Sequence, residues 1–392
     1  MTFRIAVVGG SLGGLTVGCL LRDAGHDVTI YERSTRELEQ RGAGIGFLPA
    51  TYRYLVEHTD VDLSTISIET PFIRYLKRDG SVAHEAKHPY LFSSWNTVYR
   101  TLLDAFDSDR YQLGHELVDF DRTPTGATAR FENGFEAQCD LLVAADGIGS
   151  LARSRLQPTA TPGYAGYVAW RGMVPESELD ETTRAALGDA ITYYVYANSH
   201  VLAYPIPGID GDVAPGQRLI NFVWYRNYNE GDDLDHLLTD ASGTRRELSV
   251  PPGAVAAVHE AELRATAAAR LPPQLGELVA KTAQPFLQVV FDLEIDRIVF
   301  DRVALLGDAA FLVRPHAAAG TAKAADDGWT LTQAIENAET LDQALAAWEP
   351  AQLALGHDLQ QRTRRIGVRS QVENSWTPGD PEFIFGLYRP GD

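Results

Sequence analysis

The chain has 392 residues, enough for two or three domains around a large buried core. Apolar residues make up 45% of it and charged residues 22%, which excludes a disordered or fibrous protein. Asp and Glu outnumber Lys and Arg by 53 to 34. The resulting net charge of −19 argues against binding to nucleic acid or to an anionic membrane surface.

The cysteines and the N-terminal residues indicate in which cellular compartment the protein is expected. Cys19 and Cys139 lie far apart and have no partner spacing, so we expect neither a disulfide framework nor a metal site. The N-terminus shows no signal peptide, and no apolar run approaches the ~20 residues that a membrane span requires. These features predict a cytoplasmic protein without a membrane anchor.

The beginning of the chain predicts a βαβ unit. An apolar strand over residues 4–8 leads into a glycine turn and a helical pattern, and a second apolar strand covers residues 27–32. Strands that are apolar almost throughout are typical of a parallel sheet that is covered on both faces. We therefore predict a doubly wound, Rossmann-like α/β domain at the start of the chain.

Two later regions differ from this pattern. Short alternating strands with a turn at Asp79-Gly80 occupy residues 67–87, and aromatic, β-rich segments with one alanine-rich helix fill residues 164–296. Elsewhere the sequence predicts a helix over residues 97–106 and buried strands over 141–145 and 303–306. Helices follow, one of them bent or broken at Pro350.

This alternation predicts two domains. The second is an α+β domain built on an antiparallel sheet, and we expect it to bind the substrate. The first is discontinuous in sequence, because the chain leaves it twice and returns. The predicted boundaries are 1–66, 90–163 and 297–392 for the first domain, and 67–89 and 164–296 for the second.

The glycine turn after the first strand is the first candidate site. Gly9, Ser11 and Gly14 occupy the frame GxGxxG, where the backbone turns tightly and a pyrophosphate reaches the N-terminus of a helix. Serine replaces the middle glycine. Glu32 ends the second strand 18 residues after Gly14, close to the ~20-residue offset at which an acid binds a ribose hydroxyl. Glu32 alone could be an ordinary acid at a strand end, but beside this turn it predicts a dinucleotide site.

Two further strand ends carry acidic residues. Asp146 with Gly147 follows one buried strand, with Arg153 shortly after it, and Gly307-Asp308 follows another. Each pair taken singly is more often a plain turn. Ligands bind at the carboxyl ends of parallel strands, so we expect all three strand ends to meet at one ligand.

These segments resemble the three signatures of the FAD-dependent aromatic hydroxylases. The glycine turn with Glu32, the stretch 140–153 and the stretch 307–320 carry the resemblance, and residues 164–172 are similar to the motif that opens the second domain in that family. The resemblance implies a non-covalently bound FAD. The residues that it assigns to the cofactor are Gly9, Ser11, Leu12, Gly14, Glu32, Arg33, Gly44, Asp146, Arg153, Gly307, Asp308, Pro315, Ala319 and Gly320.

The resemblance also implies an activity. Members hydroxylate a small hydroxylated aromatic or N-heteroaromatic ring through a flavin hydroperoxide, with O₂ and with NADH or NADPH as reductant, and are often homodimers. Two alternatives stay open at this point. The same chemistry can serve epoxidation or Baeyer–Villiger oxidation, or the chain can be a flavin-binding redox regulator without turnover.

The chain departs from the family pattern at three places. Phe311 stands where members have His, and Ala322 stands where they have Asn. Many members also carry Arg before the helix near residue 97, where this chain has Trp95 or Asn96. Contacts to the flavin ring therefore differ in detail, and Arg100 is a substitute candidate for the pyrophosphate.

Catalysis on a hydroxylated ring calls for a group that removes the phenolic proton. His316 is the first candidate for this base, and Tyr204 and Tyr225 are further catalytic candidates. These three residues and His200 are also the expected substrate ligands, although core aromatic residues need no functional explanation. Arg171 lies in an apolar strand, where it requires a carboxylate, a carbonyl or a ligand, and a structural ion pair is equally plausible.

Overall fold

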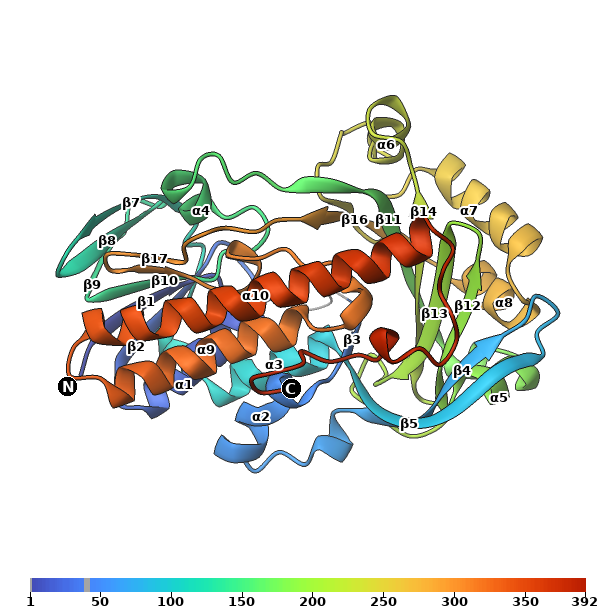
Figure 1. Ribbon diagram of the computed structural model, residues 1–392, viewed down its shortest axis with the longest axis horizontal. Helices are drawn as coiled ribbons and strands as arrows, with labels where there is room; N and C mark the ends of the chain where they lie inside the picture. The colour runs from blue at the N-terminus through green and yellow to red at the C-terminus, as the bar shows by residue number, and fades with distance from the viewer. Residues whose placement is uncertain (1, 39–42) are drawn as a thin grey trace.

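The structure is a computed structural model that describes residues 2–38 and 43–392. It has two lobes, each built on its own sheet (Figure 1). The long helix α10 (Leu341–Gln371) runs from one lobe to the other. Within the described residues, no helix is both long enough and apolar enough to cross a bilayer.

The first lobe contains a six-stranded sheet. Its central strand β1 pairs in parallel with β10 and β2, so that Val8 lies beside Ala144 and Tyr31. Only the edge pair β17–β18 is antiparallel. This arrangement confirms the predicted Rossmann-like class. The strand order is β17 (Val299–Phe300), β18 (Val303–Leu305), β10 (Leu141–Ala144), β1 (Arg4–Val8), β2 (Asp27–Glu32) and β6 (Tyr111–Leu113).

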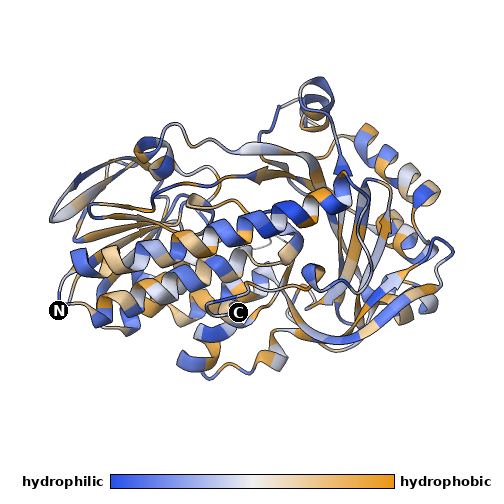
Figure 2. Ribbon diagram, in the orientation of Figure 1, coloured by the Kyte–Doolittle hydropathy of each residue, from blue (hydrophilic) through white to orange (hydrophobic). Residues whose placement is uncertain are grey.

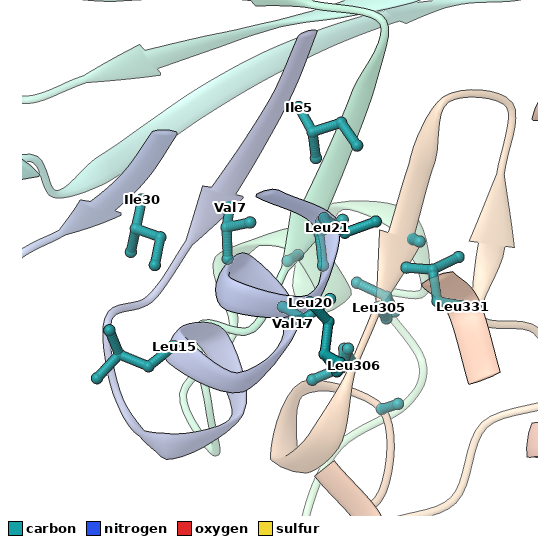
Figure 3. Close-up of a cluster of buried hydrophobic side chains, with 14 of the residues drawn as sticks. Ile5, Val7, Leu15, Val17, Leu20, Leu21, Ile30, Leu305, Leu306 and Leu331 are labelled. Atoms are coloured by element: carbon teal, nitrogen blue, oxygen red, sulfur yellow. The ribbon is translucent and has the colours of Figure 1, made fainter. Parts of the chain in front are cut away.

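Helices cover one face of this sheet and a small sheet covers the other. Side chains alternate along β1, so Ile5 and Val7 pack against the helices while Ala6 and Val8 face the small sheet. Figure 3 shows Ile5, Val7 and Ile30 beside leucines of the helices. The helices are α1 (Leu12–Asp23), α3 (Trp95–Ala105), α9 (Gly320–Asn337) and α10, and the small sheet is β7 (Leu117–Thr123), β8 (Gly126–Phe131) and β9 (Glu136–Cys139).

The second lobe contains a nine-stranded sheet. Its neighbours run antiparallel except β12 and β4, which confirms the predicted α+β class. The strand order is β15 (Ser249–Val250), β16 (Phe286–Asp292), β11 (Gly163–Pro175), β14 (Leu219–Asn227), β13 (Ser199–Ile206), β12 (Ala190–Tyr196), β4 (Ile68–Leu76), β5 (Val82–Ser94) and β3 (Gly44–Gly46).

The two faces of the large sheet have different partners. Val168 and Trp170 on β11 point into an apolar cluster beneath the outer helices, whereas Tyr167 and Ala169 belong to the cluster that faces the first lobe. Figure 2 shows hydrophobic and hydrophilic residues alternating along α9 and α10, as expected for helices that bury one side. The remaining helices are α2 (Pro49–His58), α4 (Leu151–Leu156), α5 (Glu181–Leu187), α6 (Asp232–Leu237), α7 (Ala257–Arg270) and α8 (Pro273–Lys281).

The structure corrects three details of the sequence prediction. Helix α3 begins at Trp95, because the Ser94 side chain accepts a hydrogen bond from the Thr97 amide at 2.9 Å. Helix α10 continues through Pro350 without a break. Strand β5 extends through Pro89 to Ser94. The proline is tolerated because it lies where the register with β4 shifts, next to Thr70, and a proline is found at such irregularities.

The domain boundaries stay a prediction. Two contacts of the second lobe involve residues that this prediction gives to the first domain. Residues 92–94 and 44–46, both given to the first domain, pair with each other at the edge of the large sheet. After α10 the chain runs back along the second lobe (Figure 1). There the Phe385 amide donates to the Tyr90 hydroxyl at 2.7 Å.

Candidate functional site

The glycine turn after β1 has the close contacts that its motif requires. Gly9 has a φ of +102°, and a Cβ there would lie 2.2 Å from the carbonyl oxygen of Ala145. A Cβ on Gly14 would lie 1.8 Å from the carbonyl oxygen of Gly9. Only glycine fits either position. Ser11 is the N-cap of α1, and its side chain makes no capping bond, so its hydroxyl is available to a ligand.

Glu32 is fixed beside this turn. Its carboxylate accepts hydrogen bonds from the Gly10 amide at 2.8 Å and from the Ser34 amide at 2.9 Å, and the side chain is buried. Each oxygen keeps a second lone pair, so the carboxylate can still accept from a ligand hydroxyl. The neighbouring Arg33 is exposed.

Asp146 follows strand β10. One of its oxygens accepts from the Ala152 amide at 3.2 Å, and the other is buried without a partner among the described residues. Burial raises the pKa of Asp146 above its ordinary value. Arg153 donates to the carbonyl oxygens of Ile148, Asp308 and Ala309 at 2.5 to 3.3 Å. Arg153 therefore holds the loops after β10 and β18 together.

Asp308 follows strand β18. Its side chain is exposed at the surface of the cleft. Desolvation by the surrounding protein raises its pKa to about 6, and the positive charge of Arg153 acts in the opposite direction. The preceding Gly307 amide donates to Asp327 at 2.9 Å, and Asp327 forms a buried ion pair with Lys323 on the same helix. This network fixes the loop that presents Asp308.

The strand ends and the inner face of the large sheet enclose a cleft between the lobes. It holds about 1400 Å³ of space, including open solvent at its mouth. The N-termini of α1 and α9 both reach it, at Leu12 and Gly320. The predicted site residues on its wall are Ser11, Leu12, Gly44, Tyr204, Tyr225, Gly307, Asp308, Pro315, Ala319 and Gly320.

The other predicted residues lie off the wall. Gly9, Gly14 and Arg153 shape or join the loops, Glu32 and Asp146 support the strand ends, and Arg33 faces solvent. The remaining two are His200 and His316, and both lie one layer behind Tyr225, whose ring lines the cleft.

The structure places His316 behind the wall of the cleft. Its Nε2 lies 2.6 Å from the Tyr167 hydroxyl, and its side chain is 4% exposed. Burial, followed by the nearby His200 and Arg314, lowers the pKa of His316 well below its ordinary value. An imidazole that does not line the cleft, and whose lowered pKa makes it a weak base, does not have the position or the basicity of a general base.

His200 is equally enclosed. Its Nδ1 is hydrogen-bonded to the Ser370 hydroxyl, and burial lowers its pKa to about 3. Its ring centre lies 4.5 Å from that of Tyr225 and 4.7 Å from that of Trp376. Both histidines therefore support Tyr225 from behind.

The two tyrosines on the wall differ in their hydroxyl groups. The Tyr204 hydroxyl donates to the carbonyl oxygen of Gly44 at 2.9 Å, and its ring stacks on Phe92 with 4.1 Å between the centres. Burial raises the pKa of Tyr204 to about 12. The Tyr225 hydroxyl makes no hydrogen bond to any residue in the described part of the chain. Tyr225 is therefore the one of the pair that has a free polar group.

Comparison with known proteins identifies the family. The chain is 38% identical over 391 residues to 2,6-dihydroxypyridine 3-monooxygenase from Paenarthrobacter nicotinovorans, which covers 98% of this chain and 96% of that enzyme. The chain belongs to the family of FAD-dependent monooxygenases. Residues 164–292 match the family model described as FAD binding domain-like, and residues 7–36 match the NAD(P)-binding Rossmann-like domain.

Two further comparisons support the same family assignment. The solved structure of 2,6-dihydroxypyridine-3-hydroxylase from Arthrobacter nicotinovorans superposes with a TM-score of 0.94 at 36% identity, covering 100% of this monooxygenase and 99% of that chain. The FAD-dependent urate hydroxylase of Klebsiella pneumoniae is 26% identical over 398 residues, which cover 95% of this chain and 93% of the relative.

The cleft of this monooxygenase fits FAD on its own geometry. The start of α1 offers free amides of the kind that bind a pyrophosphate. Glu32 is held beside the start of this helix, and its oxygens keep lone pairs that can accept hydrogen bonds from a ligand. Asp308 presents a carboxyl group inside the cleft. These groups suit the phosphates and the hydroxyl groups of a dinucleotide.

Of the departures from the family pattern, Phe311 and Ala322 lie away from the wall of the cleft and Trp95 lies on it. Phe311 and Ala322 are buried, and a Cβ on Gly356 would lie 2.5 Å from the Phe311 ring, so Phe311 fills a gap between α9 and α10. Trp95 lines the cleft and stacks on Tyr99, with 5.0 Å between ring centres. Arg100 lies on the exposed side of α3.

Sequence reasoning missed several residues of the wall. Gln288 on β16 reaches the cleft from an apolar strand, and a polar residue in such a strand was the available signal. Leu202 and Val223 look like ordinary core residues in the sequence. Phe385 arrives from the segment after α10, and nothing in the local sequence indicates its position. Arg171, noted for its apolar surroundings, also lines the cleft.

Proposed function

We propose that this monooxygenase adds a hydroxyl group to a small hydroxylated N-heteroaromatic ring, with 2,6-dihydroxypyridine as the first candidate. The observation that carries the proposal is the identity of 38%, over nearly the full length of both chains, with an enzyme named for that reaction. The aromatic and aliphatic side chains of the cleft suit a flat ring, since Leu202, Tyr204, Val223 and Tyr225 all line it.

The proposed reductant is NADH or NADPH. FAD, once reduced, supplies the activation of dioxygen from which one oxygen atom reaches the ring. The family resemblance also supports a homodimer that works in the cytoplasm. Sedimentation of the purified protein at several concentrations tests the dimer, and comparison of NADH with NADPH at equal concentration tests the reductant.

The residues of the chain would serve this reaction in three ways. Ser11 and the amides at the start of α1 would bind the pyrophosphate, and Asp308 would accept a hydrogen bond from a hydroxyl group of the cofactor. The N-terminus of α9 at Gly320 would lend partial positive charge to an electron-rich group in the cleft. The apolar side chains would exclude water from the reacting ring.

The test is reductant oxidation by the purified holoenzyme with and without 2,6-dihydroxypyridine, beside a panel of simple phenols. We expect strong stimulation by the pyridine and a product heavier by one oxygen atom, identified by mass spectrometry. Stimulation without an oxygenated ring would identify the compound as an effector and would overturn the proposed substrate. A phenol that is hydroxylated faster than the pyridine would also overturn it.

A further inference from the structure

Arg171 has an unusual position on the large sheet. It lies on β11, where it is flanked by Val223 of β14 and Phe286 of β16 in the register. Its side chain is half-buried and lines the cleft together with Tyr204 and Tyr225. The guanidinium lies close enough to both phenols to act on them electrostatically. A positive charge is therefore held among apolar and aromatic groups.

This charge has no partner among the residues that the structure describes. Arg171 makes no hydrogen bond and no ion pair with any residue of the described ranges, and its Nε is buried without an acceptor. Arg314, at the edge of the same cluster, shows the usual arrangement, because it donates from Nε and Nη2 to Asp292. A half-buried guanidinium without an acceptor is unfavourable unless a ligand completes its hydrogen bonds. Arg171 lines the cleft, so a ligand in the cleft can reach it.

The chemistry of the cleft selects an anion as this ligand. Arg171 is fixed on a central strand, and the N-terminus of the 18-residue helix α9 adds partial positive charge at Gly320 on the same wall. A guanidinium presents two parallel N–H donors that suit two neighbouring acceptor atoms in one plane. The oxygen and the adjacent ring nitrogen of an ionised hydroxypyridine are such a pair.

We propose that Arg171 is the substrate-binding residue that takes the ring as its oxyanion, with its two donors on the ring oxygen and the neighbouring ring nitrogen. The inference rests on the proposed function and deepens it by naming the ionic form of the substrate. An ionised ring oxygen makes the ring a stronger nucleophile toward the transferred oxygen atom. The hydroxyl proton is released to water before binding, so no protein base is required.

The residues around the cleft agree with this order of events. His316 and His200 lie behind Tyr225 and do not line the cleft, and burial lowers the pKa of both, so neither is placed to take the proton from a bound ring. The titratable groups that share the wall with Arg171 are Tyr204 of β13, Tyr225 of β14 and Asp308 after β18, and burial raises the pKa of all three. The cation that acts on the Asp308 carboxyl group is Arg153. Neither phenol is ionised near neutral pH, so neither competes for Arg171.

The test compares two ligands on FAD-loaded enzyme. One is 2,6-dihydroxypyridine, which can ionise, and the other is 2,6-dimethoxypyridine, which has no hydroxyl proton to lose. Titration of the flavin absorbance gives the dissociation constants, and the ligand absorbance reports its protonation state. Wild-type enzyme is expected to bind the dihydroxy ligand as the anion and to bind it more tightly than the dimethoxy ligand.

The variants are Arg171→Gln and Arg171→Lys. Arg171→Gln is expected to raise the dissociation constant of the dihydroxy ligand by about tenfold to a hundredfold and to leave that of the dimethoxy ligand unchanged. The dissociation constant of Arg171→Lys for the dihydroxy ligand is expected to lie between those of the wild type and Arg171→Gln, because lysine keeps the positive charge but lacks the two parallel N–H donors. Arg130→Gln, which removes a charge from strand β8 outside the cleft, is the matched control and is expected to bind as wild type does.

Three results would overturn the inference. They are unchanged binding of the dihydroxy ligand in Arg171→Gln, a neutral bound ligand in the wild-type enzyme, and loss of FAD from Arg171→Gln, which would place Arg171 in the cofactor site. Failure of the proposed function has a different signature. If another hydroxylated ring is the one hydroxylated and its binding falls in Arg171→Gln, the role of Arg171 holds and the proposed substrate is wrong.

Discussion

The Tyr167 hydroxyl lies 2.6 Å from Nε2 of His316, and the guanidinium of Arg314 approaches the same hydroxyl from the other side at 3.4 Å. Because Arg314 can only donate, the phenol oxygen accepts from it, and the same hydroxyl is hydrogen-bonded to the imidazole. His316 is therefore held neutral and in a fixed orientation behind Tyr225. The pair stabilises the wall of the cleft from within.

Replacing His316 by Gln is expected to affect stability rather than proton transfer. The variant should lose about 1 to 2 kcal/mol of unfolding free energy, because a buried hydrogen bond is removed. The pH profile of kcat should keep its shape, because the imidazole does not titrate in the working range. A profile that loses its acidic limb in the variant would restore His316 as the base.

The same burial predicts a loss of stability in acid. The pKa of His316 is lowered in the folded protein, so below the ordinary value of 6.5 the unfolded chain binds a proton that the folded protein does not. His200, with a pKa of about 3, acts in the same direction. These two residues stabilise the fold above pH 6.5, and this contribution falls as the pH drops. Urea unfolding at several pH values should show a shallower acid decline in His316→Gln, and an unchanged decline would contradict the assignment.

Asp308→Asn separates cofactor binding from stability. The raised pKa of about 6 means that the carboxyl group favours the folded protein only when protonated, and that this advantage is lost as the pH rises from about 4 through 6. The side chain is open to solvent, so screening reduces the effect on the apoprotein to less than about 1 kcal/mol, in favour of the variant at pH 8. Titration with FAD should show affinity weakened by about tenfold. Unchanged FAD affinity would remove Asp308 from the cofactor site.

Gly14→Ala tests the glycine turn. The added methyl group would meet the Gly9 carbonyl oxygen at 1.8 Å, which the turn cannot relieve without moving, so we expect a loss of more than about 3 kcal/mol and of bound FAD. The matched control is Gly276→Ala in helix α8, where the nearest neighbour of the Cβ is the backbone oxygen of Ala267 at 3.8 Å. That control should be neutral or stabilised by up to about 1 kcal/mol. Equal behaviour of the two variants would contradict the geometry of the turn.

Tyr204→Phe and Tyr225→Phe form a matched pair. The Tyr204 hydroxyl is committed to the Gly44 carbonyl oxygen, so its removal should cost about 1 kcal/mol of stability and leave ring binding nearly unchanged. The Tyr225 hydroxyl has no partner among the described residues, so its removal should raise the dissociation constant of the ring substrate by roughly threefold to tenfold. Flavin absorbance titration of both variants measures the contrast. The reverse order would contradict the assigned roles.

The parts of the fold that the sequence predicts are those with local causes. The glycine turn, Glu32 and the acidic residues after β10 and β18 follow from short motifs at strand ends, and parallel pairing brings these ends together. Pro350 was misleading because a single proline does not interrupt a helix of 31 residues that packs along much of its length. Pro89 likewise does not end β5, which continues to Ser94.

The wall of the cleft was less predictable, because distant segments form it. The sequence flags Arg171 as unusual, but only the sheet shows that its side chain points toward Tyr225 and not into an ion pair. His316 stands in the expected loop, yet the packing of Tyr167 and Tyr225 around it decides that it is buried and neutral. Phe385 depends on the path of the chain after α10, for which no local pattern exists.

The most direct test of the account is the origin of the oxygen atom in the product. Purified holoenzyme is supplied with 2,6-dihydroxypyridine, NADH or NADPH, and dioxygen of the heavy isotope, and the ring product is examined by mass spectrometry. The account predicts one heavy oxygen atom on the ring, with reductant consumed in proportion. Reductant consumption without a labelled ring, for this pyridine and for the panel of phenols, would contradict ring hydroxylation as the function of this cleft.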